Sequence, residues 1–273
     1  MNYMRWNRII GICLIVLLFG VGRSWAQQRV VKNLTTFDDK KIHFGFTLGI
    51  NVMDFSLEHY NTLGESPWIV PEDYSNITTK RNLAGLIPAT KLRADVKDYS
   101  PGFTVGMVSS LRLSPSLNLR FVPGLSFGQR KLFYIDLTQN IAKETIVQYL
   151  DGDPSQFYKV KSTYMDFPLL LKYKSSRLIN YRPYVIAGGA MRVDLAKSKG
   201  DDLVQLKKTG FYLEAGIGLD SYLQFFRLST ELKISIGLTD VLKRNYQDEA
   251  TVLYSKAFKQ VRADMVTLSF HFE

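Results

Sequence analysis

Residues 40–55, which read KKIHFGFTLGINVMDF, alternate between two unlike sets of side chains. Such strict alternation predicts a β-strand with one apolar face and one face of another kind. The second face carries glycines at positions 45 and 49, and glycine weakens a strand and packs nothing when it faces water. The apolar parity consists of Phe44, Phe46, Leu48, Ile50 and Val52, and the other of His43, Gly45, Thr47, Gly49 and Asn51.

The same alternation recurs along the chain and predicts eight strands that are long compared with the average soluble strand. Long connections follow the first, third, fifth and seventh strands, and short ones follow the second, fourth and sixth. Link lengths that alternate in this way, with an even strand count, are typical of bacterial outer-membrane barrels. The predicted strands are residues 42–52, 102–113, 117–129, 160–173, 181–194, 210–223, 226–238 and 263–272.

A soluble ligand-binding barrel of the lipocalin kind would show the same alternation with inside and outside exchanged. The polar parity favours the membrane barrel, because bulky charges of both signs stand beside glycines that leave room for them in a narrow interior. A cation at mid-depth on a lipid face would cost ~2–4 kcal/mol, and the apolar parity is almost free of charge. The predicted interior polar network comprises Arg120, Asp166, Lys172, Glu214, Asp220, Glu231 and Lys233.

These patterns predict an all-β fold: an eight-stranded antiparallel up-and-down transmembrane β-barrel with short periplasmic turns and long extracellular loops. The segment 181–194 is the ambiguous one, because its apolar residues fall on both parities and Gly188 and Gly189 could bend it. Aromatic residues gather near the strand ends and predict interfacial girdles. They are Phe103, Phe127, Phe133, Tyr173, Tyr181, Tyr222, Phe226 and Phe272.

Residues 1–26 are typical of a secretory signal peptide, with Arg5 and Arg8 before a short apolar run and small residues at 24 and 26. Cleavage after Ala26 would leave a polar periplasmic tail, 27–40, and a barrel domain, 41–273. The only cysteine, Cys13, lies in the apolar run, so the exported chain has no disulfide and no thiolate metal site. No cofactor is expected.

The formal net charge of the full chain is +10. No nucleic-acid-binding motif is visible and the chain is exported, so we expect no nucleic-acid partner. Basic loops that face the anionic lipid of the outer membrane, or an acidic protein surface, fit better. A merely basic soluble protein is the alternative.

The runs FDDKKIHFGF (37–46) and NVMDF (51–55) resemble the opening of the PorT family, outer-membrane barrels of Bacteroidetes. Three further pieces occur where the resemblance expects them: YMDFPLL (164–170), RPY (182–184) and ELK (231–233), the last followed by Gly237 and Leu238. They are shared with many small barrels of these bacteria. The resemblance implies a part in the type IX secretion system, which exports cargo proteins and supports gliding motility in some species. It also implies other secretion-system proteins as partners, and it carries over no catalytic residue.

Two other classes of function stay open from the sequence. One is a stand-alone structural or adhesive barrel that binds ligands through its loops, and the other is a membrane enzyme. The only candidate for hydrolysis is His59 with Asp54 and Glu58 nearby, and a solvated loop is the simpler interpretation. We therefore predict no enzymatic activity. His43 and His271 lie near the ends of the first and last strands but lack further ligands for a metal site.

The first long connection holds the apolar cluster PWIVP at 67–71. Trp68 and Ile69, placed between prolines, are candidates for docking a partner, because exposed tryptophan often anchors an interface. Folding back over the barrel mouth is the alternative.

Overall fold

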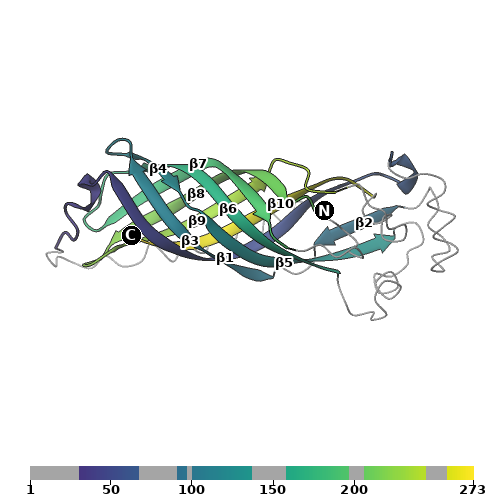
Figure 1. Ribbon diagram of the computed structural model, residues 1–273, viewed down its shortest axis with the longest axis horizontal. Helices are drawn as coiled ribbons and strands as arrows, with labels where there is room; N and C mark the ends of the chain where they lie inside the picture. Colours follow the sequence, from purple (N-terminus) through teal and green to yellow (C-terminus); the bar gives the residue numbers. More distant parts are fainter. Residues whose placement is uncertain (1–30, 68–90, 97–99, 137–157, 197–205, 244–256) are drawn as a thin grey trace. The chain divides into compact units, whose positions relative to one another are not determined.

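Antiparallel strands join into a single sheet that closes on itself as an eight-position ring (Figure 1). In this computed structural model the described residues are 31–67, 91–96, 100–136, 158–196, 206–243 and 257–273. Their strands are β1 (Ile42–His59), β2 (Leu92–Val96), β3 (Pro101–Arg112), β4 (Leu117–Phe121), β5 (Gly124–Asp136), β6 (Tyr158–Lys174), β7 (Tyr181–Asp194), β8 (Thr209–Tyr222), β9 (Arg227–Gly237) and β10 (Phe258–Phe272). Two short 3-10 helices, η1 (Phe37–Asp39) and η2 (Leu63–Glu65), precede and follow β1. No described helix has the length and apolar character needed to span a bilayer.

The ring closes where β1 pairs with β10 on one side and with β3 on the other. The remaining neighbours follow in chain order through β9, β8, β7 and β6. The predicted eight-stranded antiparallel barrel is confirmed. The ambiguous segment 181–194 forms one regular strand, β7, which pairs with β6 and β8 along its length.

One position of the ring is shared by two strands, β4 and β5, where the sequence predicted a single strand over 117–129. The prediction missed the break at Val122 and Pro123. Proline has no N–H to donate to a ladder, and here its carbonyl accepts a hydrogen bond from the Met107 N–H instead. Both strands pair with β3 and β6, so the ring stays closed. Strand β2, also missed, pairs with the far end of β5.

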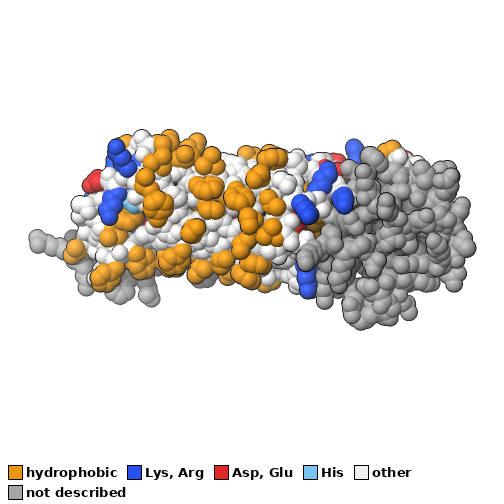
Figure 2. Space-filling view, viewed as in Figure 1, with side chains coloured by type: hydrophobic (Ala, Val, Ile, Leu, Met, Phe, Trp, Pro, Cys, Tyr) orange, Lys and Arg blue, Asp and Glu red, His pale blue; other side chains and the backbone are white. Residues whose placement is uncertain are grey.

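Alternation along β1 shows which face is which. The outward side chains of Phe44, Leu48 and Ile50 are 72%, 46% and 55% exposed, whereas the inward side chains of Thr47 and Asn51 are 3% and 0% exposed. Outward apolar side chains on the other strands form a band around the ring, which Figure 2 shows in orange on one face. This band is the surface that faces lipid.

Beyond Val52 the pattern on β1 reverses. The inward positions become the apolar residues Met53 and Phe55, which are buried, while the outward positions become Asp54 and Ser56. The ring continues past the band into a segment that we call the outer extension, defined by its buried apolar core. That core consists of Phe55, Ala94, Val96, Leu132, Val160, Ala190, Tyr212, Val241, Leu242, Ala257, Phe258, Val261 and Ala263.

The opposite end of the ring holds the short connections, residues 113–116, 175–180 and 223–226. The described part of the predicted tail lies here as well. Asn33 hydrogen-bonds to Asn180 and to the Tyr222 carbonyl, and Arg112 donates to the Asp38 carbonyl. We call residues 33–40 the N-terminal plug.

The side chain of Phe133, one of the aromatic residues predicted as girdles, is not among those described, and the others divide into two groups. Phe103, Tyr173 and Tyr181 are exposed among the apolar side chains at the ends of the strands, and Phe103 stacks on Phe127 with ring centroids 4.6 Å apart. The prediction for Tyr222 is wrong. This residue points inward, is 1% exposed, and hydrogen-bonds to Asp38 of the plug.

Candidate functional site

All seven residues of the predicted polar network point into the ring. Arg120, Lys172 and Asp220 are 0% exposed, and the most accessible side chain, that of Lys233, is 12% exposed. Burying a charge requires an opposite charge and hydrogen bonds around it. The seven residues meet this requirement in two groups.

The group nearer the outer extension, which we call the mid-barrel cluster, consists of Asp166, Arg192, Glu214 and Lys233. Arg192 bridges the two carboxylates, with its Nε 2.8 Å from Asp166 and its Nη2 2.6 Å from Glu214. The Lys233 ammonium lies 2.7 Å from the other Glu214 oxygen. Two cations and two carboxylates balance, and Ser126 and Ser235 donate hydroxyl hydrogen bonds to the carboxylates.

The second group, the short-turn cluster, consists of Arg120, Lys172, Asp220, Arg227, Glu231, His271 and Glu273. Arg120 lies 2.7 Å from Glu231 and 3.5 Å from Glu273. Lys172 pairs with Asp220 at 2.6 Å, and Arg227 pairs with Glu273 at 2.6 Å. Every carboxylate of this cluster therefore has a cationic partner from another strand.

The N-terminal plug adds a further anion to this end. The Asp38 carboxylate lies within 3.3–3.7 Å of cations on three strands and accepts a hydrogen bond of 2.7 Å from the Tyr222 hydroxyl. Phe37 stacks on the His43 ring at 4.3 Å. The Arg227 guanidinium lies 4.6 Å from the Phe37 ring centroid, within cation–π range. The three cations are Lys174, Arg182 and Arg227.

Burial acts to raise the pKa of Asp38, but the Tyr222 hydrogen bond and the three nearby cations outweigh it, so that the pKa lies below the ordinary value. Asp38 is therefore ionised near neutral pH. Its charge fastens the plug to the barrel.

Sequence reasoning missed several members of these clusters, among them Arg192 and Arg227. Arg192 was hidden because its strand carries inward apolar residues, Tyr184 and Ile186, that blurred the alternation. Arg227 lies on the same parity as Glu231 and Lys233, so the alternation could have identified it. The other missed members are His271 and Glu273, and the contacts of the plug through Asp38, Lys174 and Arg182 were missed as well.

Glycines on the inward parity make room for this packing. A Cβ built on Gly218 would lie 2.2 Å from the ring of Tyr184. Tyr184 in turn donates a hydrogen bond of 2.9 Å to Glu231 and lies under the Lys172 ammonium. A side chain at 218 would displace the tyrosine from both contacts.

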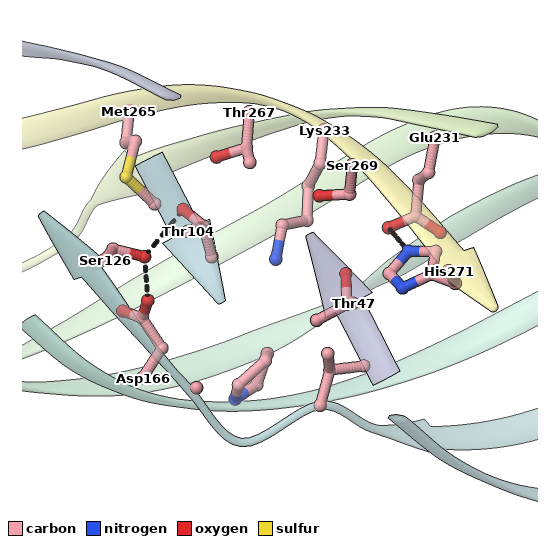
Figure 3. A pocket seen from close by; sticks show the side chains of 13 residues that line it. Thr47, Thr104, Ser126, Asp166, Glu231, Lys233, Met265, Thr267, Ser269 and His271 are labelled. Atoms are coloured by element: carbon pink, nitrogen blue, oxygen red, sulfur yellow. Dashed lines mark hydrogen bonds and ion pairs between the residues drawn. The ribbon is translucent and has the colours of Figure 1, made fainter. Parts of the chain in front are cut away.

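Between the two clusters lies a cavity of about 30 Å³ (Figure 3). Since a water molecule needs ~10–15 Å³ by this measure, the cavity holds roughly two. Ser126 links Thr104 to Asp166, and the hydroxyl groups of Thr47 and Thr267 have no hydrogen-bond partner in the protein. Bound water would satisfy these two hydroxyls. The cavity is far too small to carry a solute.

The three histidines lie in different parts of the barrel and make different contacts. His43 stacks on Phe37, and His271 lies 3.4 Å from Glu231. His59, in the outer extension, accepts a hydrogen bond from the Ala94 N–H at Nε2. Within the part of the chain that the structure describes, no group of three or more His, Cys, Asp or Glu side chains is arranged to hold a metal ion. Trp68 and Ile69 lie outside the described residues.

Comparison with known proteins yields one family and a set of solved structures. A family model for an outer membrane protein beta-barrel domain matches residues 25–243. OprG from Pseudomonas aeruginosa is similar at 10% identity and a TM-score of 0.40, over 85% of this chain and 93% of its own. AlkL, solved in lipid bilayers, is 11% identical with a TM-score of 0.36, over 93% of this chain and 94% of its own. The outer-membrane protease OmpT from Escherichia coli is 10% identical with a TM-score of 0.31, over 85% of this chain and 94% of its own. No curated protein matches significantly.

Proposed function

The chain belongs to the outer membrane protein beta-barrel domain family, and on this premise we propose that it is a sealed, non-enzymatic component of the type IX protein secretion system. One observation supports a role other than conduction: the ring interior is filled by buried, ion-paired side chains on both sides of a water-sized cavity. A barrel that carries nothing through its lumen must act through its surfaces. Those surfaces are available to lipid and to other proteins.

The secretion-specific part of the proposal is supported by the resemblance of residues 37–55 to the PorT opening. The same residues form the plug and the first strand. Phe37 and Asp38 lie at the end of the ring that holds the short turns, and β1 pairs with both β10 and β3 where the ring closes. In this proposal the plugged end faces periplasmic secretion-system proteins. Export depends on the predicted signal peptide, cleaved after Ala26.

Gene deletion tests this function. A null strain should retain cargo proteins that the wild-type strain secretes, and the wild-type gene supplied in trans should restore their secretion. Normal secretion in a verified null strain would exclude the proposal. Purified protein in planar bilayers should also show no stable conductance. This measurement tests the closed lumen independently of the role in secretion.

A stand-alone structural or adhesive barrel is the second candidate, and the outer extension is the observation that favours it. Strands that continue beyond the apolar band, with their own apolar core, give long loops a rigid base. Affinity purification from detergent-solubilised membranes separates the two candidates. A secretion component should copurify with other secretion subunits, whereas a stand-alone barrel should copurify with none.

We also propose that the protein has no hydrolytic activity. His59 Nε2 already accepts a backbone hydrogen bond, and its ring contacts the Phe258 ring with centroids 5.0 Å apart, which gives it a packing role. A membrane enzyme would lose lipid- or peptide-cleaving activity in a His59→Ala variant that still inserts. Our expectation is that the wild-type protein shows no such activity.

A further inference from the structure

The outward side chains on three strands follow the same order where the apolar band ends toward the outer extension. Each strand passes from an apolar residue to an uncharged polar residue and then to a lysine. The three series are Phe127, Gln129 and Lys131 on β5, Met165, Thr163 and Lys161 on β6, and Phe211, Thr209 and Lys207 just before and within β8.

Pairing places these lysines along one side of the ring. Lys161 lies opposite Gln129 and Lys131 lies opposite residue 159, so Lys131 and Lys161 are diagonal neighbours on the outer face. Such diagonal neighbours are roughly 7–8 Å apart, and their Cβ atoms are somewhat closer. Between β6 and β8, the outward side of β7 ends at the exposed Leu195, whose N–H binds the Thr163 carbonyl.

The other side of the ring differs in charge at the same level. On β10 and β1 the first polar outward residues are Asp264 and Asp54, which are cross-strand partners. Beyond them come Arg262 and Ser56, also paired. The described outward positions of β5, β6 and β7, by contrast, include no acidic side chain, because Asp166 and Asp194 face inward.

We propose that Lys131, Lys161 and Lys207 form a binding site for the phosphate groups of outer-leaflet lipid. The long connections place this end of the barrel at the cell surface, and the lysines stand just above the apolar band, where lipid head groups lie. Lys161 and Lys207 are exposed and Lys131 is half-buried, and lysines at this depth attract anionic head groups. Lys207 also donates to the Asp240 carbonyl at 3.0 Å, which holds its ammonium at this rim (Figure 2 shows Lys and Arg side chains beyond the orange band). The site does not depend on the proposed secretion role.

Binding of phosphorylated lipid A to the purified full-length barrel in uncharged detergent tests the site. The wild-type protein should bind phosphorylated lipid A at least ~10-fold more tightly than the same lipid after enzymatic removal of its phosphates. Inorganic phosphate at equal concentration should not compete, because the site takes phosphate held at a membrane surface. Equal binding of both lipids, or full competition by inorganic phosphate, would overturn the proposal.

Two variants place the site on the molecule. The triple variant Lys131→Gln, Lys161→Gln and Lys207→Gln should lose most of the preference for phosphorylated lipid. The matched variant Lys259→Gln with Arg262→Gln removes cations from β10 and should keep it. Heat-dependent gel migration confirms that both variants are folded. If the two variants lose equal affinity, the lysines are not a distinct site and a protein partner for that surface would be the better explanation.

Discussion

The membrane-facing part of the ring and the outer extension share one set of strands but have opposite interiors. Within the band, apolar side chains such as Phe44 face outward and charged ones such as Arg120 face inward. In the extension, Phe55 and Val261 face inward, whereas Asp54 and Arg262 face outward. The backbone alternation continues unbroken across the change. The pleat fixes two faces, while the surrounding solvent decides which face is apolar.

The largest effect should come from removing a buried carboxylate inside the band. A Glu231→Ala variant leaves Arg120 without its closest partner and deprives Tyr184 and His271 of theirs, so we expect a loss of about 3–5 kcal/mol in the free energy of unfolding. Glu58→Ala, an exposed carboxylate of the extension, should change it by less than about 0.5 kcal/mol. Urea titration in lipid vesicles measures both. Equal losses would mean that the interior pairs contribute no more than surface charges.

A charge on the lipid face should have the next largest effect. Leu232 lies outward near the middle of β9, so Leu232→Arg should cost ~2–4 kcal/mol. Lys233→Leu, one residue on and facing inward, should cost less, because Arg192 and Ser235 still bind Glu214. Folding yield into vesicles ranks the two. The reverse ranking would invert the assignment of inside and outside.

Valine-to-alanine changes at two positions of β10 should show a smaller difference in stability between the two regions. Val261→Ala opens a gap in the core of the extension and should cost about 1–2 kcal/mol. Val266→Ala faces lipid, whose chains can fill the space, and should cost less. Hydrogen exchange of the extension should accelerate in the first variant alone. Comparable acceleration in both would show that the extension has no independent core.

The smallest effect is a pH response confined to the extension. Burial and the nearby Arg93 lower the pKa of His59 to about 4. The unfolded chain takes up a proton near pH 6.5, so the stability that neutral His59 contributes is complete above that pH and is lost as the pH falls toward 4. With partial solvent exposure, the loss at pH 5 should be about 1 kcal/mol. Exchange of the Ala94 amide, corrected for its intrinsic rate, should therefore rise as the pH falls from 7.5 to 5.

A His59→Gln variant is the control for this response, since its amide oxygen can accept the same hydrogen bond without titrating. Its Ala94 exchange, corrected for intrinsic rate, should not depend on pH in this window. Asp38 titrates below its ordinary pKa and acts only at lower pH. A pH response that persists in the variant would assign it to another group.

The sequence predicts most of the band and little of the extension, for a physical reason. Residues 42–52 alternate cleanly because lipid and a charged interior demand opposite residues. In the extension the inward positions are apolar and the outward ones polar. The apolar residues therefore change parity between Ile50, which faces outward, and Phe55, which faces inward, and this change hides the alternation where the two regions meet. Short β2 has no pattern long enough to detect.

The sequence predicted that the interior holds paired charges, but it did not identify all the residues of the network. Charged residues beside glycines, such as Asp220 after Gly218, mark an inward face wherever the outward one is purely apolar. The prediction for Tyr222 was wrong because an aromatic residue at a strand end can lie either in an interfacial girdle or inside the end of the barrel. Its partner, Asp38, belongs to a segment without periodicity. Only the three-dimensional arrangement joins residues that far apart in the sequence.

The seam between β1 and β10 links closure of the cylinder to its charge balance. Glu273 directly follows β10, and its carboxylate binds Arg227 on β9 and lies near Arg120 on β4. A sheet that lacks β10 thus leaves Arg227 without its closest carboxylate, and this attraction favours the docking of β10 in register. Docking of β10 should therefore close the ring and complete its charge pairing in the same step. A chain stalled before this step would remain an open sheet that cellular quality control can recognise.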